Sequence, residues 1–214
     1  MLTVQPFTFN PVRENTYLLY NDKGDCCIID PGFYFAAEEQ ELKGFIEQNK
    51  LKPVLLLNTH CHLDHIFGNR FVYKTYNLTL HLHSLEKPVL EYGPTAGQLW
   101  QLPFDNYDAE LTFIDEGQTV RIGEEELHIL FTPGHSPGSI SFYSKEHKFV
   151  ISGDVLFEGS VGRTDLPGGD FVILEESIKT KLYTLPADTI VYPGHGDSTT
   201  IGDEMKGNPF VKMV

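Results

Sequence analysis

The sequence predicts a mixed α/β protein (an α+β arrangement) in which two β-sheets pack face to face and helices cover their outer faces. Two observations lead to this prediction. In each half of the 214-residue chain, short β-rich runs come together with helical patterns, and turn-forming residues separate the runs. Because each sheet must bury the face that its helices leave open, packing the two sheets against each other is a natural layered solution.

The first half begins with three β-rich runs, and the segment Asn21–Asp25 supplies a turn between the second and the third. Ala36–Asn49 is predicted to be a helix, because Leu42, Phe45 and Ile46 fall at positions i, i+3 and i+4. The expected strands are Leu2–Phe9, Asn15–Tyr20, Cys26–Asp30, Pro53–Asn58 and Thr79–Leu82, and the other expected helices are Phe67–Tyr76 and Ser84–Glu91, with Ser84 as the N-cap.

The second half is again mostly β. Gly93–Asp108 contains several helix breakers and is predicted to be a loop or irregular insertion. The expected strands are Thr119–Ile122, Leu127–Thr132, Ser139–Tyr143, Phe149–Ser152 and Thr189–Tyr192, and the expected helices are Phe171–Leu182 and Ile201–Lys206. Since no flexible linker or low-complexity segment interrupts the chain, we expect one domain over residues 1–214.

The net charge of −14 argues against partners that are themselves anionic. Nucleic acid and anionic lipid bind mainly through Lys and Arg, so neither is expected as a partner. No apolar run reaches the roughly 18–20 residues of a membrane span. The N-terminus does not resemble a secretory signal, and three cysteines make no disulfide framework, which together predict a cytoplasmic location. Cys26 and Cys27 adjoin in a predicted strand and should point to opposite faces.

The segment Thr59–Gly68 (THCHLDHIFG) follows a predicted buried strand and concentrates four side chains that bind metals: His60, His62, Asp64 and His65. On an extended turn, alternating residues share one side, which would bring the first three together. Imidazole nitrogen and carboxylate oxygen are suitable ligands for zinc, iron or manganese. A lone histidine is usually structural, but packing does not explain four such side chains directly after one strand.

Three later segments share one form, in which a predicted strand ends at a ligand beside glycine or proline. Glycine permits the backbone turn or the close approach that such a site needs. The segments are Phe131–Gly138 (FTPGHSPG), which presents His135, Phe149–Gly159 (FVISGDVLFEG), which presents Asp154, and Ile190–Gly196 (IVYPGHG), which presents His195.

Seven donors are enough for two ions, because each ion needs about four protein or water ligands and a carboxylate can bridge. We therefore expect two divalent metal ions, with zinc as the first choice and iron or manganese as alternatives. Cys61 lies between two ligands and is expected to point away from the ions. The predicted groups are His60, His62 and His135 for one ion, Asp64, His65 and His195 for the other, and Asp154 as the bridge.

This pattern, HxHxDH followed by single His, Asp and His residues, resembles the metallo-β-lactamase-fold superfamily over nearly the whole chain. Gly153–Asp170 and Tyr192–Phe210 resemble the corresponding segments of short bacterial type II glyoxalases, the hydroxyacylglutathione hydrolase-like proteins. The resemblance implies an αββα sandwich with the metals at one sheet edge, the seven matching residues as ligands, and thioester hydrolysis. The chain ends soon after Phe210, which leaves little room for the C-terminal helical region that helps full-length members bind glutathione.

The expected reaction is hydrolysis of a small-molecule thioester such as S-lactoylglutathione to a hydroxy acid and a free thiol. Two ions lower the pKa of water from about 15.7 toward about 7 and so supply a hydroxide nucleophile. Asp64 is the expected catalytic residue, because it can bind metal and also accept a hydrogen bond from the hydroxide. Arg163 is a candidate substrate-binding cation, although an ion pair with Asp165 would explain it equally well.

Two other functions remain open at this point. A persulfide dioxygenase would use one iron, here on His60, His135 and Asp154, and metal content with oxygen uptake would distinguish it. A non-enzymatic metal-binding protein is the second alternative, although structural zinc sites are usually closed by four ligands. A β-lactamase is disfavoured by the absence of a secretion signal and of a Cys ligand at Asp154, and a nuclease by the net charge. The sequence does not predict the oligomeric state.

Overall fold

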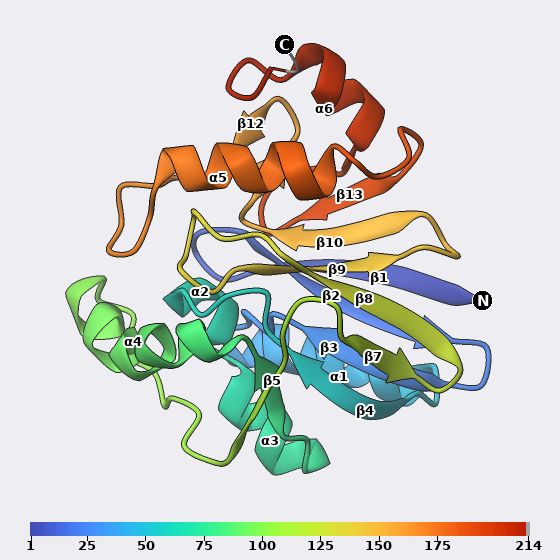
Figure 1. Cartoon of the computed structure of the whole chain (residues 1–214). Helices are drawn as coiled ribbons and strands as arrows, with labels where there is room; N and C mark the ends of the chain where they lie inside the picture. The colour runs from blue at the N-terminus through green and yellow to red at the C-terminus, as the bar shows by residue number, and fades with distance from the viewer. Residues whose placement is uncertain (213–214) are drawn as a thin grey trace.

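Six strands from the N-terminal part of the chain form the first sheet of the computed structural model, which describes residues 1–212 (Figure 1). The last two residues of the expected 1–214 domain lie outside the described part. The strands lie side by side in chain order, antiparallel from β1 to β3 and parallel from β3 to β6. They are β1 (Leu2–Phe9), β2 (Glu14–Asn21), β3 (Asp25–Ile29), β4 (Lys52–Leu57), β5 (Leu80–Leu82) and β6 (Leu111–Phe113).

The second sheet has the order β14-β13-β10-β9-β8-β7. β10 and β13 are parallel, so their carboxyl ends meet at one edge of the sheet, and the other neighbours are antiparallel. The strands are β7 (Thr119–Ile122), β8 (Glu125–Phe131), β9 (Ile140–Ser144), β10 (Phe149–Gly153), β13 (Ile190–Pro193) and β14 (Thr199–Thr200), and a separate ribbon pairs β11 (Leu156–Phe157) with β12 (Ser160–Val161).

Helices cover the outer face of each sheet (Figure 1). α1, α3 and α4 pack on the first sheet, and α5, η2 and α6 pack on the second. Within residues 1–212, no helix is both long and apolar enough to cross a membrane. The helices are α1 (Ala36–Gln48), α2 (Leu63–Ile66), α3 (Asn69–Tyr76), η1 (Ser84–Glu86), α4 (Lys87–Leu99), α5 (Phe171–Ser177), η2 (Ile178–Leu182) and α6 (Ile201–Gly207).

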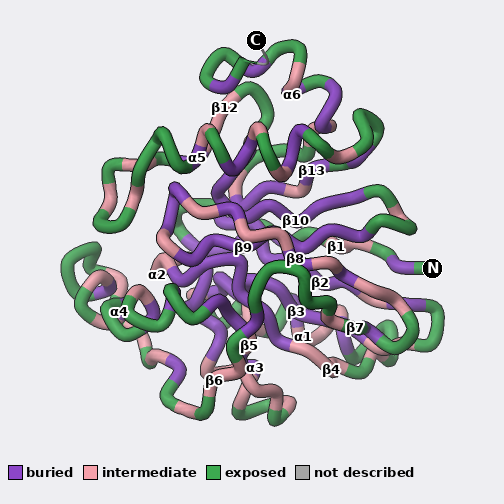
Figure 2. The backbone as a smooth tube through the Cα atoms, viewed as in Figure 1, coloured by how far each residue is buried: buried purple, intermediate pink, exposed green. Residues whose placement is uncertain are grey.

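The inward side chains of both sheets form a core between them, where Tyr17 and Leu57 of the first sheet share a cluster with Phe142 of the second. Residues of β2, β3, β9 and β10 are almost continuously buried (Figure 2). Cys26 belongs to the core under the helices and Cys27 to the core between the sheets, which confirms that they point to opposite faces. Two mixed sheets between two helical layers confirm the predicted fold class.

The prediction of an irregular segment over Gly93–Asp108 is wrong in its first half, because α4 continues to Leu99. Pro94 lies inside this helix and cannot donate to the carbonyl of Leu90, four residues earlier, which normally kinks or ends a helix. The side-chain amide of Asn106 donates to that carbonyl instead, at 2.7 Å. A contact from beyond the helix therefore replaces the hydrogen bond that proline removes.

Two smaller expectations also differ from the structure. The turn η1 is capped by His83, whose Nδ1 accepts a hydrogen bond from the Leu85 N–H, whereas Ser84 already lies inside the turn. The expected helix Phe67–Tyr76 starts at Asn69, because the chain first forms the separate short helix α2. The strands β6, β11, β12 and β14 were not predicted, since two or three residues carry too little pattern to indicate a strand.

Candidate metal centre

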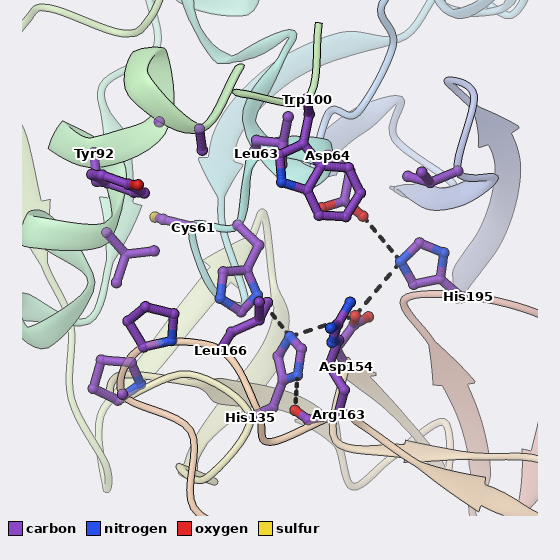
Figure 3. Close-up of a pocket in the computed structure, with 18 of the residues that line it drawn as sticks. Cys61, Leu63, Asp64, Tyr92, Trp100, His135, Asp154, Arg163, Leu166 and His195 are labelled. Carbon is purple, nitrogen blue, oxygen red and sulfur yellow. Dashed lines mark hydrogen bonds and ion pairs between the residues drawn. The ribbon is translucent and has the colours of Figure 1, made fainter. Parts of the chain in front are cut away.

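The structure brings all seven predicted ligands together where connecting segments of both sheets meet at one end. Figure 3 shows four of them, Asp64, His135, Asp154 and His195. Asp64 lies in the first turn of α2, not on an extended turn as we expected. His65 lies on the same helix, whereas His60, His62, His135, Asp154 and His195 follow strand ends, as predicted. His60 and His62 lie in the loop after β4, Asp64 and His65 on α2, His135 after β8, Asp154 after β10, and His195 after β13.

The first group, His60, His62 and His135, directs three ring nitrogens at one point. Nδ1 of His62 lies 2.8 Å from Nε2 of His135, which lies 3.2 Å from Nε2 of His60. Two imidazole nitrogens this close either share a proton or direct their lone pairs at a third atom. Because three nitrogens converge here, the group has the donor set of a zinc-type site.

The second group, Asp64, His65 and His195, lies beside the first. Nε2 of His195 is 3.0 Å from Oδ2 of Asp64, and Nε2 of His65 is 3.5 Å from the same oxygen. Asp154 faces both groups: its Oδ2 is 3.5 Å from Nε2 of His135 and 3.6 Å from Nε2 of His195, and its Oδ1 is 3.4 Å from Nε2 of His65. Asp154 therefore lies between the two groups, where the predicted bridging ligand would have to lie.

Two buried atoms of this centre, Nε2 of His65 and Oδ1 of Asp154, have no hydrogen-bond partner among the described residues. Buried polar atoms in proteins are nearly always paired, so such exceptions need an explanation. A cation bound between the two atoms would satisfy both. The donor set and these unpaired atoms thus fit a divalent metal ion.

Hydrogen bonds on the far side of the rings fix how the histidines present their nitrogens. Nδ1 of His135 donates to the carbonyl of Arg163 at 2.8 Å, and Nδ1 of His195 donates to the carbonyl of Arg13 at 3.2 Å. A carbonyl can only accept, so in each ring Nδ1 carries the proton and Nε2 keeps its lone pair. Both Nε2 atoms are thereby prepared to bind a metal.

Asp30 lies behind the centre and orients one histidine of each group. Its Oδ2 accepts from Nδ1 of His65 at 3.2 Å and from Oγ1 of Thr59 at 2.5 Å. The same Thr59 hydroxyl lies 3.1 Å from Nδ1 of His60 and accepts its proton. The sequence analysis missed Asp30, although an acidic residue at the end of a buried apolar strand was an available signal.

Two glycines allow the ligand loops to approach one another. Gly153 has a φ of +54°, and a Cβ there would collide with Oγ1 of Thr59. A Cβ on Gly194, next to a ligand, would collide with Oδ1 of Asp154 and lie 2.8 Å from Cε1 of His65. The predicted need for glycine beside the ligands is therefore confirmed at both positions.

Glu86, at the end of η1, connects the two loops that carry the first group. Its Oε2 accepts from the backbone N–H of Cys61 at 2.7 Å, between two histidine ligands. Its Oε1 accepts from Oγ of Ser136 at 2.5 Å and from the N–H of Gly138 at 2.7 Å, just after the third. Burial raises the pKa of this carboxyl, and the three hydrogen bonds oppose that effect. The sequence analysis missed Glu86 as well.

Burial and charge give the two groups different electrostatic character. Burial lowers the pKa of His60, and it lowers that of His62 to about 3. Burial acts in the same direction on His65, but the carboxylates of Asp64 and Asp154 outweigh it and raise its pKa. The first group therefore offers neutral imidazoles at pH 7, whereas the second balances its charges between imidazole and carboxylate.

A cavity of about 1130 Å³ opens beside the centre and includes ligand side chains in its wall (Figure 3). Arg163 also lines this cavity, and its guanidinium donates to both carboxylate oxygens of Asp165, at 2.7 and 2.8 Å. Cys61 borders the cavity, but its side chain packs in the core under the helices and belongs to neither donor group. Its thiol points away from His135 and Asp154, as we expected (Figure 3).

The layered fold, with His and Asp ligands on the loops at one end of its two sheets, is that of the metallo-hydrolases. A family model described as the metallo-beta-lactamase superfamily matches residues 9–195, which include all seven candidate ligands. The chain belongs to this superfamily, as its motifs indicated.

Two curated relatives match the chain over almost its full length. A probable metallo-hydrolase, YqgX of Bacillus subtilis (strain 168), is 40% identical and covers 94% of this chain and 93% of its own. The hydroxyacylglutathione hydrolase GloC of Haemophilus influenzae is 38% identical and covers 93% of each.

Solved structures extend the comparison. The structure of the BLEG-1 B3 metallo-beta-lactamase has a TM-score of 0.90 at 38% identity and covers 99% of this chain and all of its own. The structure of TTHA1623 in a di-iron-bound form has a TM-score of 0.88 at 38% identity and covers 97% of this chain and all of its own. The fold and the superfamily are thus common to proteins whose names give different reactions.

Proposed function

We propose that this protein is a metal-dependent hydrolase that cleaves a thioester such as S-lactoylglutathione to a hydroxy acid and a free thiol. The observation that carries the proposal is the pair of His/Asp groups that face Asp154 beside an open cavity. Similarity to a relative named hydroxyacylglutathione hydrolase supports the thioester as substrate. Similarity to a di-iron structure supports two ions in the centre, with zinc, iron and manganese all compatible with the ligands.

His60, His62 and His135 would hold one ion, Asp64, His65 and His195 the other, and Asp154 would contact both. Bound ions of this kind polarise a carbonyl and lower the pKa of water, which gives hydrolysis a nucleophile at neutral pH. Asp64 has a second role in the proposal: its carboxylate accepts a hydrogen bond from the attacking water and orients it.

The leaving group places little demand on the protein. Water adds to the carbonyl carbon and releases a proton to the solvent, the carbon–sulfur bond breaks, and the sulfur leaves as a thiolate. Because the corresponding thiol has a pKa of about 8.5, the thiolate is far more stable at neutral pH than an alkoxide or amide. A proton-donating residue beside the sulfur is therefore not needed. The reaction depends instead on the ligand groups and on how the cavity positions the carbonyl.

The test combines metal analysis of the purified protein with an assay on S-lactoylglutathione. We expect close to two ions per chain and hydrolysis that chelators abolish and added zinc, iron or manganese restores. His62→Ala and Asp154→Ala should each lose metal and reduce turnover by at least about a hundredfold, the order of effect expected when a polarising group is removed. Glu91→Gln, on the exposed side of α4, is the matched control and should behave like the wild type.

Wild-type turnover in either ligand variant would contradict the proposal. So would one iron per chain with oxygen uptake on glutathione persulfide and no thioester cleavage, since that result would indicate a dioxygenase. Hydrolysis of a β-lactam in preference to every thioester would indicate the activity named for BLEG-1. Stoichiometric metal without turnover of thioesters, lactones or phosphoesters would indicate a metal-binding protein.

A further inference from the structure

One wall of the cavity is a continuous apolar face of α4. Val89, Tyr92, Ala96, Leu99 and Trp100 line the cavity and recur at helical spacing, so they lie along one side of this helix. Three of them are large and strongly exposed: Leu99 is 69% exposed, and Tyr92 and Trp100 are each 51% exposed. Apolar side chains that are gathered at a cavity and still open to solvent are typical of a binding site.

The opposite wall is also apolar. Phe157 of β11, Val161 of β12, and Leu166 and Pro167 of the segment before α5 line the cavity from the second sheet's side. Tyr92, Trp100 and Leu166 surround the space that the labelled ligands face (Figure 3). A group attached to a carbonyl at the centre would therefore extend between two hydrocarbon surfaces.

Away from the metal centre, few side chains of the described cavity lining could pair with a charged group of a substrate. Among the described residues that line it, Arg163 is the one Lys or Arg side chain. Both carboxylate oxygens of Asp165 accept from its guanidinium, which offsets that charge. A glutathione moiety brings two carboxylates, and the described lining offers neither of them an unpaired Lys or Arg side chain.

We propose that the preferred substrate carries an uncharged apolar group of roughly six to ten carbon atoms beside its scissile bond, a size that a cavity of this volume accommodates. This inference rests on the proposed thioester hydrolysis and names its substrate class. The apolar group lies against the α4 face and the carbonyl lies at the ligand groups. An acyl chain and the alkyl chain of a thiol carry the same chemistry, so the experiment contains an arm for each.

The first experiment measures binding without turnover. Trp100 is the single tryptophan of the chain and lines the cavity, so its fluorescence reports occupancy. Metal-loaded protein is titrated with the ethyl, butyl and octyl thioethers of N-acetylcysteamine, which cannot be hydrolysed. We expect affinity to rise about fourfold for each methylene group that is buried. Leu99→Ser keeps the fluorophore and should weaken octyl binding about fivefold, whereas Phe113→Ala, exposed on β6 outside the cavity, should not.

The second experiment measures kcat/KM on two substrate series and on S-lactoylglutathione. One series joins acetyl, butanoyl and octanoyl groups to N-acetylcysteamine, and the other joins acetyl to ethanethiol, butanethiol and octanethiol. At least one series should rise tenfold or more from its shortest to its longest member, and the series that rises identifies the side that carries the chain. Trp100→Ala should flatten that rise, and Phe113→Ala should preserve it.

The outcomes separate the two proposals. Cleavage of S-lactoylglutathione with no dependence on chain length, or octyl binding no tighter than ethyl binding, would overturn the apolar substrate and leave thioester hydrolysis standing. Tight binding of the octyl thioether with no cleavage of any thioester would overturn the proposed reaction itself.

Discussion

Asp30 contacts the ligands of both groups without belonging to either. Its carboxylate accepts hydrogen bonds from His65 and Thr59, and the Thr59 hydroxyl in turn accepts one from His60, which orients that ring. Asp30→Asn replaces one oxygen by an NH₂ donor that faces other donors. We expect metal affinity to fall by about ten- to a hundredfold, as is typical when a partner of metal-ligating histidines is lost. Competition with a chromophoric chelator measures this change.

A matched control shows whether loss of charge alone explains that result. Asp105→Asn makes the same chemical change at a side chain that is almost fully exposed. Its metal affinity should equal that of the wild type. Equal affinities in both variants would show that Asp30 does not position the ligands.

His62 gives a prediction about pH, because burial lowers its pKa to about 3 in the metal-free protein. In the unfolded chain the pKa of His62 is about 6.5, so below that pH His62 is protonated in the unfolded state but stays neutral in the folded state. The free energy of unfolding therefore begins to decrease as the pH falls through 6.5 and continues to decrease until about pH 3. Relative to His62→Gln, the free energy of unfolding of the wild type should drop by about 2 kcal/mol between pH 7 and pH 5.

Urea unfolding of both metal-free proteins across that range measures this difference. The comparison with the variant cancels the other titrating groups to first order. A difference that does not change with pH would mean that His62 takes up its proton in the folded state as easily as in the unfolded chain.

Residues that were marked by their sequence neighbours could be predicted, whereas residues that act on distant parts of the chain could not. The ligands were readable from local signals: four of them cluster in Thr59–Gly68, and His135, Asp154 and His195 each follow a strand end beside glycine or proline. Asp30 and Glu86 act through hydrogen bonds to residues 25 to 52 positions away, and the local sequence does not indicate which residues these partners are. For Arg163, the sequence offered substrate binding and an ion pair with Asp165 as equal alternatives, and the structure shows the ion pair.

At the scale of elements, α4 shows why part of the fold was not predictable. Most strands and α1 were visible, because a buried face imposes its period on the sequence. In α4, Gly93, Pro94 and Gly97 argue against a helix. The tertiary structure overrides them: Asn106 satisfies the carbonyl that Pro94 leaves free, and Cβ atoms on the two glycines would crowd Ile66 and the carbonyl of Leu102.

The helical pair η1–α4 is joined to the metal centre through Glu86, which makes a prediction at this scale. Glu86→Gln leaves one oxygen to accept where three donors now converge. We expect a loss of about 1–3 kcal/mol in the free energy of unfolding, the usual cost of an unsatisfied buried group. Glu91→Gln, one turn further along the exposed side, should change stability by less than about 0.5 kcal/mol.

Urea denaturation of the two variants measures these values, and metal affinity gives a second reading. Because Glu86 contacts both loops of the first group, its variant should also bind the ion of that group less tightly. Unchanged stability and affinity in Glu86→Gln would show that the two loops hold their positions without this carboxylate.

At the scale of the whole molecule, the three cysteines report on packing, because each is fully buried at a different place. Cys26 lies under the helices, Cys27 between the sheets, and Cys61 beside the cavity. Burial raises the pKa of Cys26 to about 12 and raises that of the other two as well, so at pH 8 all three are unreactive thiols. The folded protein should therefore not react with Ellman's reagent, whereas three thiols should react in guanidinium chloride.

The order in which the three thiols become reactive toward Ellman's reagent shows whether the layers unfold together. If the layers unfold together, all three should appear in one transition along a denaturant series. Reaction of a single thiol under native conditions would contradict the prediction and would indicate local opening, at the cavity if the labelled residue is Cys61.

Hydrogen bonds from β2 hold the segment that presents His195, the last candidate ligand in the sequence. Asn15 donates through its backbone N–H to the carbonyl of Gly194 at 2.7 Å. The Tyr17 hydroxyl donates to the carbonyl of Pro193 at 2.6 Å, so both contacts join β2 to the segment that presents His195. During synthesis on the ribosome, the N-terminal sheet emerges long before that segment exists. The nascent chain therefore carries an incomplete set of donors for most of its translation, and the full centre forms only once both ends of the chain have met.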